Sequence, residues 1–348
     1  MTGGSLPANV KFTSALRRVP PLQDFQYRLV LANEGDVCAF ELPRGASPIT
    51  VEAPSGRPMA VAPADIFLAT PGYRESTRWV SGIIPAGGPI PGDFYWVLAE
   101  CGVVGELAGD PPLETGHLAR VQYLGAVCRD SGETVNIRQF ALSRSPKTGR
   151  NMPVYLLLGT SGHVGKTTAG LAVLRALRMQ GHARVIALKA TGTPSVAEIA
   201  IYQDFGASQA FDCIDFGLPT TYPSGRGGIS EIFAHALDFC RSLPAEALVV
   251  ECGGDVLGAN VPEFLACLKA RRTDLKVILA AADALGAIGA KRMLAEIGLT
   301  ISSITGPCTD TPAMRERTQA LCGISAVNMA RGLDQGKHSH LAGVVALG

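Results

Sequence analysis

The fold of this chain is decided by one stretch, Gly159-Thr160-Ser161-Gly162-His163-Val164-Gly165-Lys166-Thr167-Thr168. It follows the apolar run 154–158 and opens a helical pattern, which predicts a strand, a glycine-rich turn and a helix N-terminus. The backbone N–H groups of such a turn and the positive end of the helix dipole together form a cradle for phosphate. The sequence therefore predicts a phosphate-binding loop, or P-loop, at residues 159–168.

Within this loop, particular residue types suit particular parts of a nucleoside triphosphate. Lys166 is expected to reach the β- and γ-phosphates, and the hydroxyl of Thr167 is expected to bind Mg²⁺. The strict pattern has Gly where this chain has Thr160, with Gly159 one step earlier. The other residues expected to contact the nucleotide are Thr160, Gly162, His163, Val164, Gly165 and Thr168.

Length, composition and charge limit the class of protein. The chain has 348 residues, 47% hydrophobic and 18% charged, which is enough apolar material for two cores. A net charge of +1, without a cluster of basic and aromatic residues, argues against nucleic-acid and membrane partners. Nine cysteines without zinc-type spacing, and no secretory signal pattern, predict reduced thiols in a cytoplasmic protein.

The sequence changes character near residue 150. Over residues 1–145, short alternating segments are broken by Gly and Pro, which predicts a small all-β barrel or sandwich followed by a polar linker. Over residues 151–348, apolar strands alternate with helical patterns, which predicts an α/β domain of the P-loop NTPase type with a mostly parallel sheet flanked by helices. Its strands are expected at 154–158, 183–189, 247–251, 276–282, 299–305 and 324–328.

Polar residues at the ends of these strands should gather at the carboxyl edge of the sheet, where ligands of such folds bind. Lys189 could neutralise a transferring phosphoryl group, or it could simply extend to solvent from a strand end. Glu251 could hold Mg²⁺ together with Thr167, or it could cap a loop. On the functional interpretation, Lys166, Lys189 and Glu251 are the catalytic residues.

Further residues are candidates for contact with a substrate. Gly253 and Gly254 would let a substrate approach the backbone closely. Asp283 could bind substrate or cap a helix, and Arg226 could clamp an anion or remain a solvated loop residue. His163 could contact phosphate or substrate, or be a tolerated loop side chain. The full set of substrate candidates is Thr191, Gly253, Gly254, Asp255, Asp283 and Arg226.

Three motifs in order resemble those of the dethiobiotin synthetase family of P-loop proteins, over about residues 154–330. The loop resembles Gly-Thr-x-x-x-Val-Gly-Lys-Thr, 189–192 is similar to a shortened second-lysine motif, and 250–254 is similar to Val-Glu-Gly-x-Gly-Gly. The resemblance implies ATP and Mg²⁺, with Lys166, Thr167, Lys189 and Glu251 serving phosphoryl transfer to a carbamate and ring closure. The chain departs from the family at 161–163, at 305–308, where an adenine-binding Asn is expected, and in its N-terminal β domain. A different substrate is therefore expected.

The leading hypothesis is an ATP- and Mg²⁺-dependent ligase that activates a carboxylate or carbamate as an acyl phosphate, which an amine then captures. Its partners would be small-molecule carboxylate and amine substrates. The β domain would serve as a lid or select the second substrate. We also expect the protein to be a homodimer. One alternative is a nucleotide-driven switch or metallochaperone NTPase, although the chain has no Asn-Lys-x-Asp motif late in the sheet. Another is a small-molecule kinase, which needs the same phosphate machinery.

Overall fold

The computed structural model describes residues 3–7, 9–21, 26–76, 80–110, 118–144, 151–223, 225–271 and 274–334. The chain divides into two compact units. The β unit comprises residues 1–143 together with 193–197 and 212–224, and the P-loop unit comprises residues 144–192, 198–211 and 225–348. The β unit thus contains two short segments from the second half of the chain.

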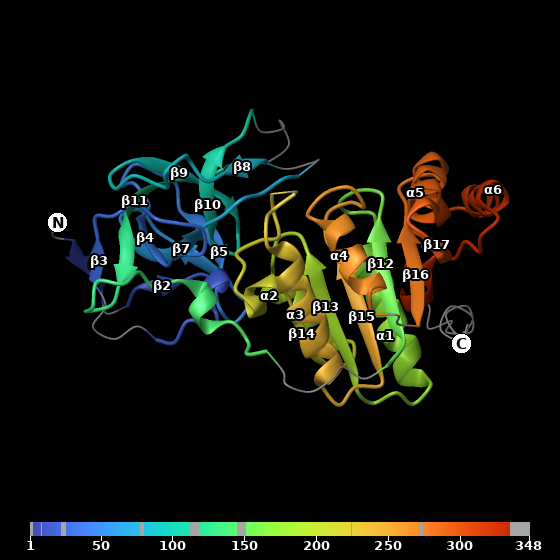
Figure 1. Ribbon diagram of the computed structural model, residues 1–348. Coiled ribbons are helices and arrows are strands. Elements are labelled where there is room, and N and C mark those ends of the chain that lie inside the picture. Colours follow the sequence, from blue (N-terminus) through green and yellow to red (C-terminus); the bar gives the residue numbers. More distant parts are fainter. Residues whose placement is uncertain are drawn as a thin grey trace. The chain divides into compact units, whose positions relative to one another are not determined.

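The P-loop unit is built on a six-stranded, all-parallel sheet with the order β14-β13-β15-β12-β16-β17 (Figure 1). Its strands are β12 (Val154–Gly159), β13 (Val185–Thr191), β14 (Ala207–Phe211), β15 (Ala247–Cys252), β16 (Leu275–Ala280) and β17 (Ile301–Thr305). Its helical elements are α1 (Lys166–Met179), α2 (Val196–Asp204), α3 (Ile229–Ser242), α4 (Val261–Lys269), α5 (Ala284–Glu296), η4 (Pro307–Thr309), α6 (Pro312–Cys322) and α7 (Met329–Asp334). Helix α2 starts in segment 193–197 of the β unit and continues into the P-loop unit. The predicted α/β architecture is therefore present, with the P-loop strand β12 inside the sheet.

The strand predictions were wrong in two places. Residues 324–328 form no strand, because Gly323 ends α6 in the left-handed conformation, α7 begins at Met329, and only Ala326 makes an isolated parallel bridge, to Ile304. Strand β14 was missed because it is a short edge strand in which Ser208 and Gln209 are exposed, so it lacks a continuous apolar signal.

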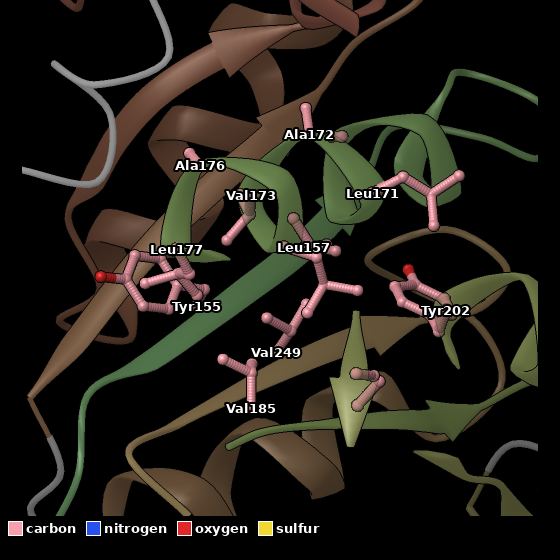
Figure 2. Close-up of a cluster of buried hydrophobic side chains, with 14 of the residues drawn as sticks. Tyr155, Leu157, Leu171, Ala172, Val173, Ala176, Leu177, Val185, Tyr202 and Val249 are labelled. Carbon is pink, nitrogen blue, oxygen red and sulfur yellow. The ribbon is translucent and has the colours of Figure 1, made fainter. Parts of the chain in front are cut away.

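One face of this sheet packs against α1, as Figure 2 shows. Tyr155 and Leu157 point to this face because successive residues of a strand alternate between faces. Burial of each large apolar side chain contributes roughly 1.5–3 kcal/mol. Gly170 lies in the middle of α1, a position where glycine is normally unfavourable. Glycine is needed here because a Cβ at position 170 would collide with the hydroxyl of Tyr202. None of the helices in the described ranges is long and apolar enough to cross a bilayer.

The β unit contains a closed ring of five strands. Strand β4 pairs with β7 and β11, β7 pairs with β10, and β9 pairs with both β10 and β11. Its strands are β1 (Gly4–Ser5), β2 (Lys11–Phe12), β3 (Gln26–Arg28), β4 (Cys38–Glu41), β5 (Ile49–Glu52), β6 (Pro58–Val61), β7 (Ile66–Pro71), β8 (Gly82–Ile83), β9 (Phe94–Ala99), β10 (Val103–Leu107) and β11 (Arg120–Cys128). Short 3₁₀ helices accompany them: η1 (Ser14–Leu16), η2 (Ile137–Phe140) and η3 (Cys213–Phe216). Ring closure pairs strand edges that would otherwise be open to aggregation.

Alternate residues from these strands supply the core of the ring. Phe40, Phe67, Tyr95, Val104 and Tyr123 come from the five different strands and belong to one buried cluster. The rings of Phe40 and Tyr123 lie 5.4 Å apart, centroid to centroid. A second cluster includes Ile214 from the later segment 212–224, so that segment is part of the core of this unit.

Candidate functional site

The P-loop joins the end of β12 at Gly159 to the start of α1 at Lys166. Gly165 has φ 89°, a left-handed conformation that favours glycine, and it is the N-cap of α1. His163 also has a positive φ, of 58°. No side chain caps the N-terminus of α1, and its first turn carries no acid. These features leave the helix end suited to an external anion.

Lys166 folds back over the loop. Its Nζ donates to the carbonyl oxygens of Ser161 at 2.9 Å and Gly254 at 2.7 Å. A Cβ at position 159 would lie 2.8 Å from Lys166 Cδ and 2.9 Å from its Nζ, so a larger residue there would displace the lysine side chain from this position. Gly159 thus leaves room for the Lys166 side chain in its observed position.

Burial sets the electrostatics of Lys166, which is only 6% exposed. Its pKa is lowered, first because burial disfavours the charged ammonium and second because the charge of Lys189 is nearby. The carboxylate of Glu251 opposes this and raises the pKa of Lys166. A phosphate chain would add further negative charge next to the buried ammonium and stabilise it.

Glu251 meets Thr167 from the neighbouring strand. The Thr167 hydroxyl donates to Glu251 Oε1 at 3.1 Å, and the Tyr202 hydroxyl donates to Glu251 Oε2 at 2.6 Å. Glu251 is 4% exposed. Burial and the charge of Glu251 together raise the pKa of Tyr202 well above its ordinary range, so Tyr202 stays a hydrogen-bond donor.

The residues present are chemically suited to Mg²⁺. Mg²⁺ prefers oxygen ligands and is usually held by one or two carboxylates together with water and substrate phosphates. Thr167 and Glu251 supply a hydroxyl and a carboxylate oxygen that already lie together. Within the described ranges, no group of three or more His, Cys, Asp or Glu side chains could hold a metal alone. Thr167 and Glu251 would supply only part of a Mg²⁺ coordination shell, and water or phosphate oxygens would supply the rest.

Lys189 lies within β13 rather than at its end, because that strand continues to Thr191. It is in register with Glu251 on the adjacent strand. Its Nζ forms an ion pair with Glu198 in the first turn of α2, and its side chain is only 10% exposed. Lys189 is thus a largely buried, paired cation, and its charge lowers the pKa of Lys166.

Several substrate candidates hold the loops of the site together. Thr191 Oγ1 donates to the carbonyl oxygen of Gly253 at 3.0 Å, and the N–H of Gly253 donates to the carbonyl oxygen of Thr191 at 3.1 Å. A Cβ on Gly253 would collide with that Thr191 oxygen. The carbonyl of Gly254 accepts from Lys166. These residues fix the loop after β15 against the end of β13.

Asp255 and Asp283 have local structural partners. Asp255 Oδ1 accepts from the N–H groups of Leu257 and Gly258, at 2.8 and 2.9 Å, which forms a tight turn. Asp283 caps α5, because its Oδ1 accepts from the N–H of Gly286 at 2.7 Å. Arg226 is half-buried in the loop before α3. The helix-capping alternative for Asp283 therefore describes the observed contact.

Thr160 belongs to the loop and also forms hydrogen bonds with β16 and the residues that follow it. Its N–H donates to the carbonyl oxygen of Ala280 at 3.0 Å, and its Oγ1 accepts from the N–H of Ala282 at 3.1 Å. The N–H of Thr160 therefore has a partner on β16. A contact of Thr160 with nucleotide stays a prediction.

A pocket of about 170 Å³ lies next to the loop. Its walls include His163, Gly165, Thr168, Gly306, Asp310 and Asn328. Asp310 Oδ1 accepts from Asn328 Nδ2 at 3.0 Å, so the pocket presents a carboxylate and an amide. The pocket would have room for a further part of a ligand if its phosphates bound at the loop.

Sequence reasoning missed Glu198 and Tyr202. Both come from α2, and neither belongs to a recognisable motif. The mid-helix Gly170 was the one available signal, because an unexplained glycine in a helix indicates close approach of another group.

The chain matches no protein-family model and no curated protein. Among solved structures it is similar to the signal recognition particle receptor FtsY from Elizabethkingia anophelis in complex with GDP, with TM-score 0.37, 15% identity, and coverage of 56% of this chain and 63% of that one. It is also similar to a DUF1611 family protein from Anabaena variabilis, with TM-score 0.38, 12% identity, and coverage of 62% of this chain and 65% of that one. A ParA family ATPase from Chlorobium tepidum has TM-score 0.32 and 12% identity, with coverage of 56% of this chain and 92% of that one. The chain spans less than two thirds of the FtsY and DUF1611 chains. TM-scores this low carry no functional argument, so the site rests on the geometry of this chain.

Proposed function

We propose that the P-loop unit binds ATP with Mg²⁺ and transfers the γ-phosphoryl group to a small carboxylate or carbamate, for capture by an amine. One observation carries this proposal: the buried Lys166 lies next to a Thr167 hydroxyl that contacts Glu251 Oε1 at 3.1 Å. A cation for phosphate and an oxygen pair for a divalent metal are the parts that phosphoryl transfer requires.

Each residue has a defined role in this proposal. Lys166 exchanges its contacts with the Ser161 and Gly254 carbonyls for phosphate oxygens. Thr167 and Glu251 would hold Mg²⁺, which would neutralise charge on the phosphates. Tyr202 keeps the Glu251 carboxylate oriented through its other oxygen. Catalysis then consists of positioning and electrostatic stabilisation.

The acceptor is proposed to be a small molecule rather than a protein side chain. Cys252 is the thiol next to Glu251, and burial together with the Glu251 charge raises its pKa, which makes it a poor nucleophile. A carboxylate oxygen would attack the γ-phosphorus while the bond to the leaving ADP oxygen breaks. An amine would then attack the carbonyl carbon, lose a proton and expel phosphate.

The first test measures phosphate release from ATP and, in parallel, from GTP, with Mg²⁺ and a panel of carboxylates and amines. We expect release that requires both an amine and a carboxyl source. Release with a carboxylate alone, leaving a stable phosphorylated product, would indicate a kinase. Turnover that responds only to a protein partner would instead indicate a switch and contradict the ligase proposal.

The second test asks whether Lys189 takes part in chemistry. Lys189→Ala should keep nucleotide affinity but lower turnover by about 10²–10³-fold, the usual effect of removing a group that stabilises a transition state. Lys269→Ala is the matched control, because that lysine contacts the carbonyl of Ile297 on the surface. Turnover at the wild-type rate in Lys189→Ala would remove Lys189 from the mechanism.

A further inference from the structure

The β unit contains a cavity that the phosphoryl-transfer chemistry does not use. Its volume is about 800 Å³, within the roughly 300–1,000 Å³ typical of small-molecule sites. It lies among β9, the start of β5 and the residues that precede each of β5, β8 and β11. All of its lining residues belong to the β unit.

Most of the lining is apolar. Aliphatic side chains of Leu42, Ile49, Val80, Val97 and Leu98 form much of the wall. Leu98 and Val80 also belong to a cluster of buried hydrophobic side chains, so this wall is backed by packed residues. An apolar cavity with a few polar groups is the usual design of a site for an organic molecule.

The polar feature of the cavity is Arg74. It is half-buried, and one guanidinium nitrogen, Nη1, donates to the carbonyl oxygen of Leu98. Burial lowers the pKa of Arg74, because charge is disfavoured away from water. No salt bridge connects Arg74 to any carboxylate of the described part of the chain, although Glu100 also lines the cavity.

The Glu100 charge acts on this half-buried guanidinium, but no carboxylate of the described residues is in ion-pair contact with it, so an external anion would stabilise its charge further. Guanidinium nitrogens form a planar fork that matches the two oxygens of a carboxylate. A second cation, Arg120, lines the same cavity, with its Cζ 5.4 Å from the Phe94 ring centroid and 5.9 Å from that of Trp96. The negative charge of Glu100 favours a ligand with one negative charge over a phosphate dianion.

We propose that this cavity binds a small organic monocarboxylate, with its carboxylate on Arg74 and its apolar body against the aliphatic wall. The proposal concerns binding to the β unit alone and does not depend on nucleotide. Its failure would therefore leave the phosphate-release tests of the P-loop unit unaffected.

Calorimetric titration of the full chain without nucleotide tests this directly. The probes are hexanoate and phenylacetate, each paired with its neutral amide, and phenyl phosphate as a dianion. We expect at least one carboxylate to bind at millimolar concentration or below, and its amide to bind roughly 10–100-fold more weakly, as the loss of a charge-assisted hydrogen bond predicts. Equal binding of acid and amide, tighter binding of phenyl phosphate, or no binding by either carboxylate would overturn the proposal.

Two variants locate the site. Arg74→Gln should weaken carboxylate binding by about the same 10–100-fold, whereas Arg57→Gln should bind like wild type, because Arg57 lies in the same unit but outside the lining. Thr50→Trp fills the cavity from an exposed position on β5 without removing Arg74, and it should abolish binding even if Arg74→Gln fails to fold. Wild-type affinity in Thr50→Trp would contradict the assignment.

Discussion

The P-loop unit and the β unit differ in how far apart in sequence their buried polar partners lie. In the P-loop unit, Lys166 and Thr167 are adjacent, and Glu251 reaches them because parallel strands end at one edge. In the β unit, Arg17 contacts Asp212 at 2.7 Å and Asp215 at 2.6 Å, almost two hundred residues later. A short sequence motif can therefore predict the site of the P-loop unit, whereas the buried contacts of the β unit join segments that no local sequence pattern connects.

The largest expected effect tests whether function is concentrated in the P-loop unit. Lys166→Ala should lower nucleotide turnover by about 10²–10³-fold, because it removes the cation placed for the phosphates. Its melting temperature should change little, because losing the hydrogen bonds to the Ser161 and Gly254 carbonyls is offset by removing a buried ammonium that burial disfavours. Turnover is measured by phosphate release and stability by thermal unfolding. Undiminished turnover would mean that the loop is not the functional centre.

The next effect concerns the long-range polar contacts of the β unit. Glu52 accepts from Ser14 Oγ and Ser195 Oγ and from the N–H groups of Val196 and Ala197. Glu52→Gln places an amide donor against these donors and should cost about 2–3 kcal/mol of unfolding free energy. Urea denaturation measures this.

Glu41→Gln on β4 is the control for Glu52→Gln and should change stability little, since the Glu41 side chain has no hydrogen bond within the described ranges. Equal stability of the two variants would mean that the network around Glu52 does not hold the later segment of the β unit in place.

A smaller effect sharpens the comparison from within the P-loop unit. Tyr202→Phe leaves Glu251 Oε2 without its donor and should cost about 1–2 kcal/mol of stability. It should also raise the Mg²⁺ concentration needed for half-maximal turnover, because the carboxylate is less well oriented. Tyr155→Phe, in the same core cluster but not bonded to Glu251, should leave the Mg²⁺ requirement unchanged (Figure 2). A shared Mg²⁺ shift would count against a positioning role for Tyr202.

The smallest effect is a pH dependence in the β unit. Burial raises the pKa of Asp36 despite hydrogen bonds from Asn33 and Asn136. A carboxyl whose folded pKa is raised contributes stability that is complete below its ordinary pKa and is lost as pH rises through the folded value. The urea midpoint should therefore decline over mildly acidic pH more in wild type than in Asp36→Asn. A steeper decline in Asp36→Asn would contradict this sign.

The sequence predicted the structure correctly where a single apolar run and a single motif were enough to define an element. The strand before Gly159 and the helix after Gly165 follow from hydrophobic runs and turn chemistry, and both are present. The edge strand β14 was missed because an edge strand need not be apolar. The ion pair of Lys189 with Glu198 had no sequence signal, because it depends on where α2 packs.

By itself, the sequence determined the P-loop and the α/β alternation around it, because backbone conformation and strand burial are local properties. Only the tertiary structure decided which partners the buried charges have: Tyr202 for Glu251, Glu198 for Lys189 and no described carboxylate for Arg74. The physical reason is that a buried charge is stabilised by groups close in space, and chain order does not specify those groups.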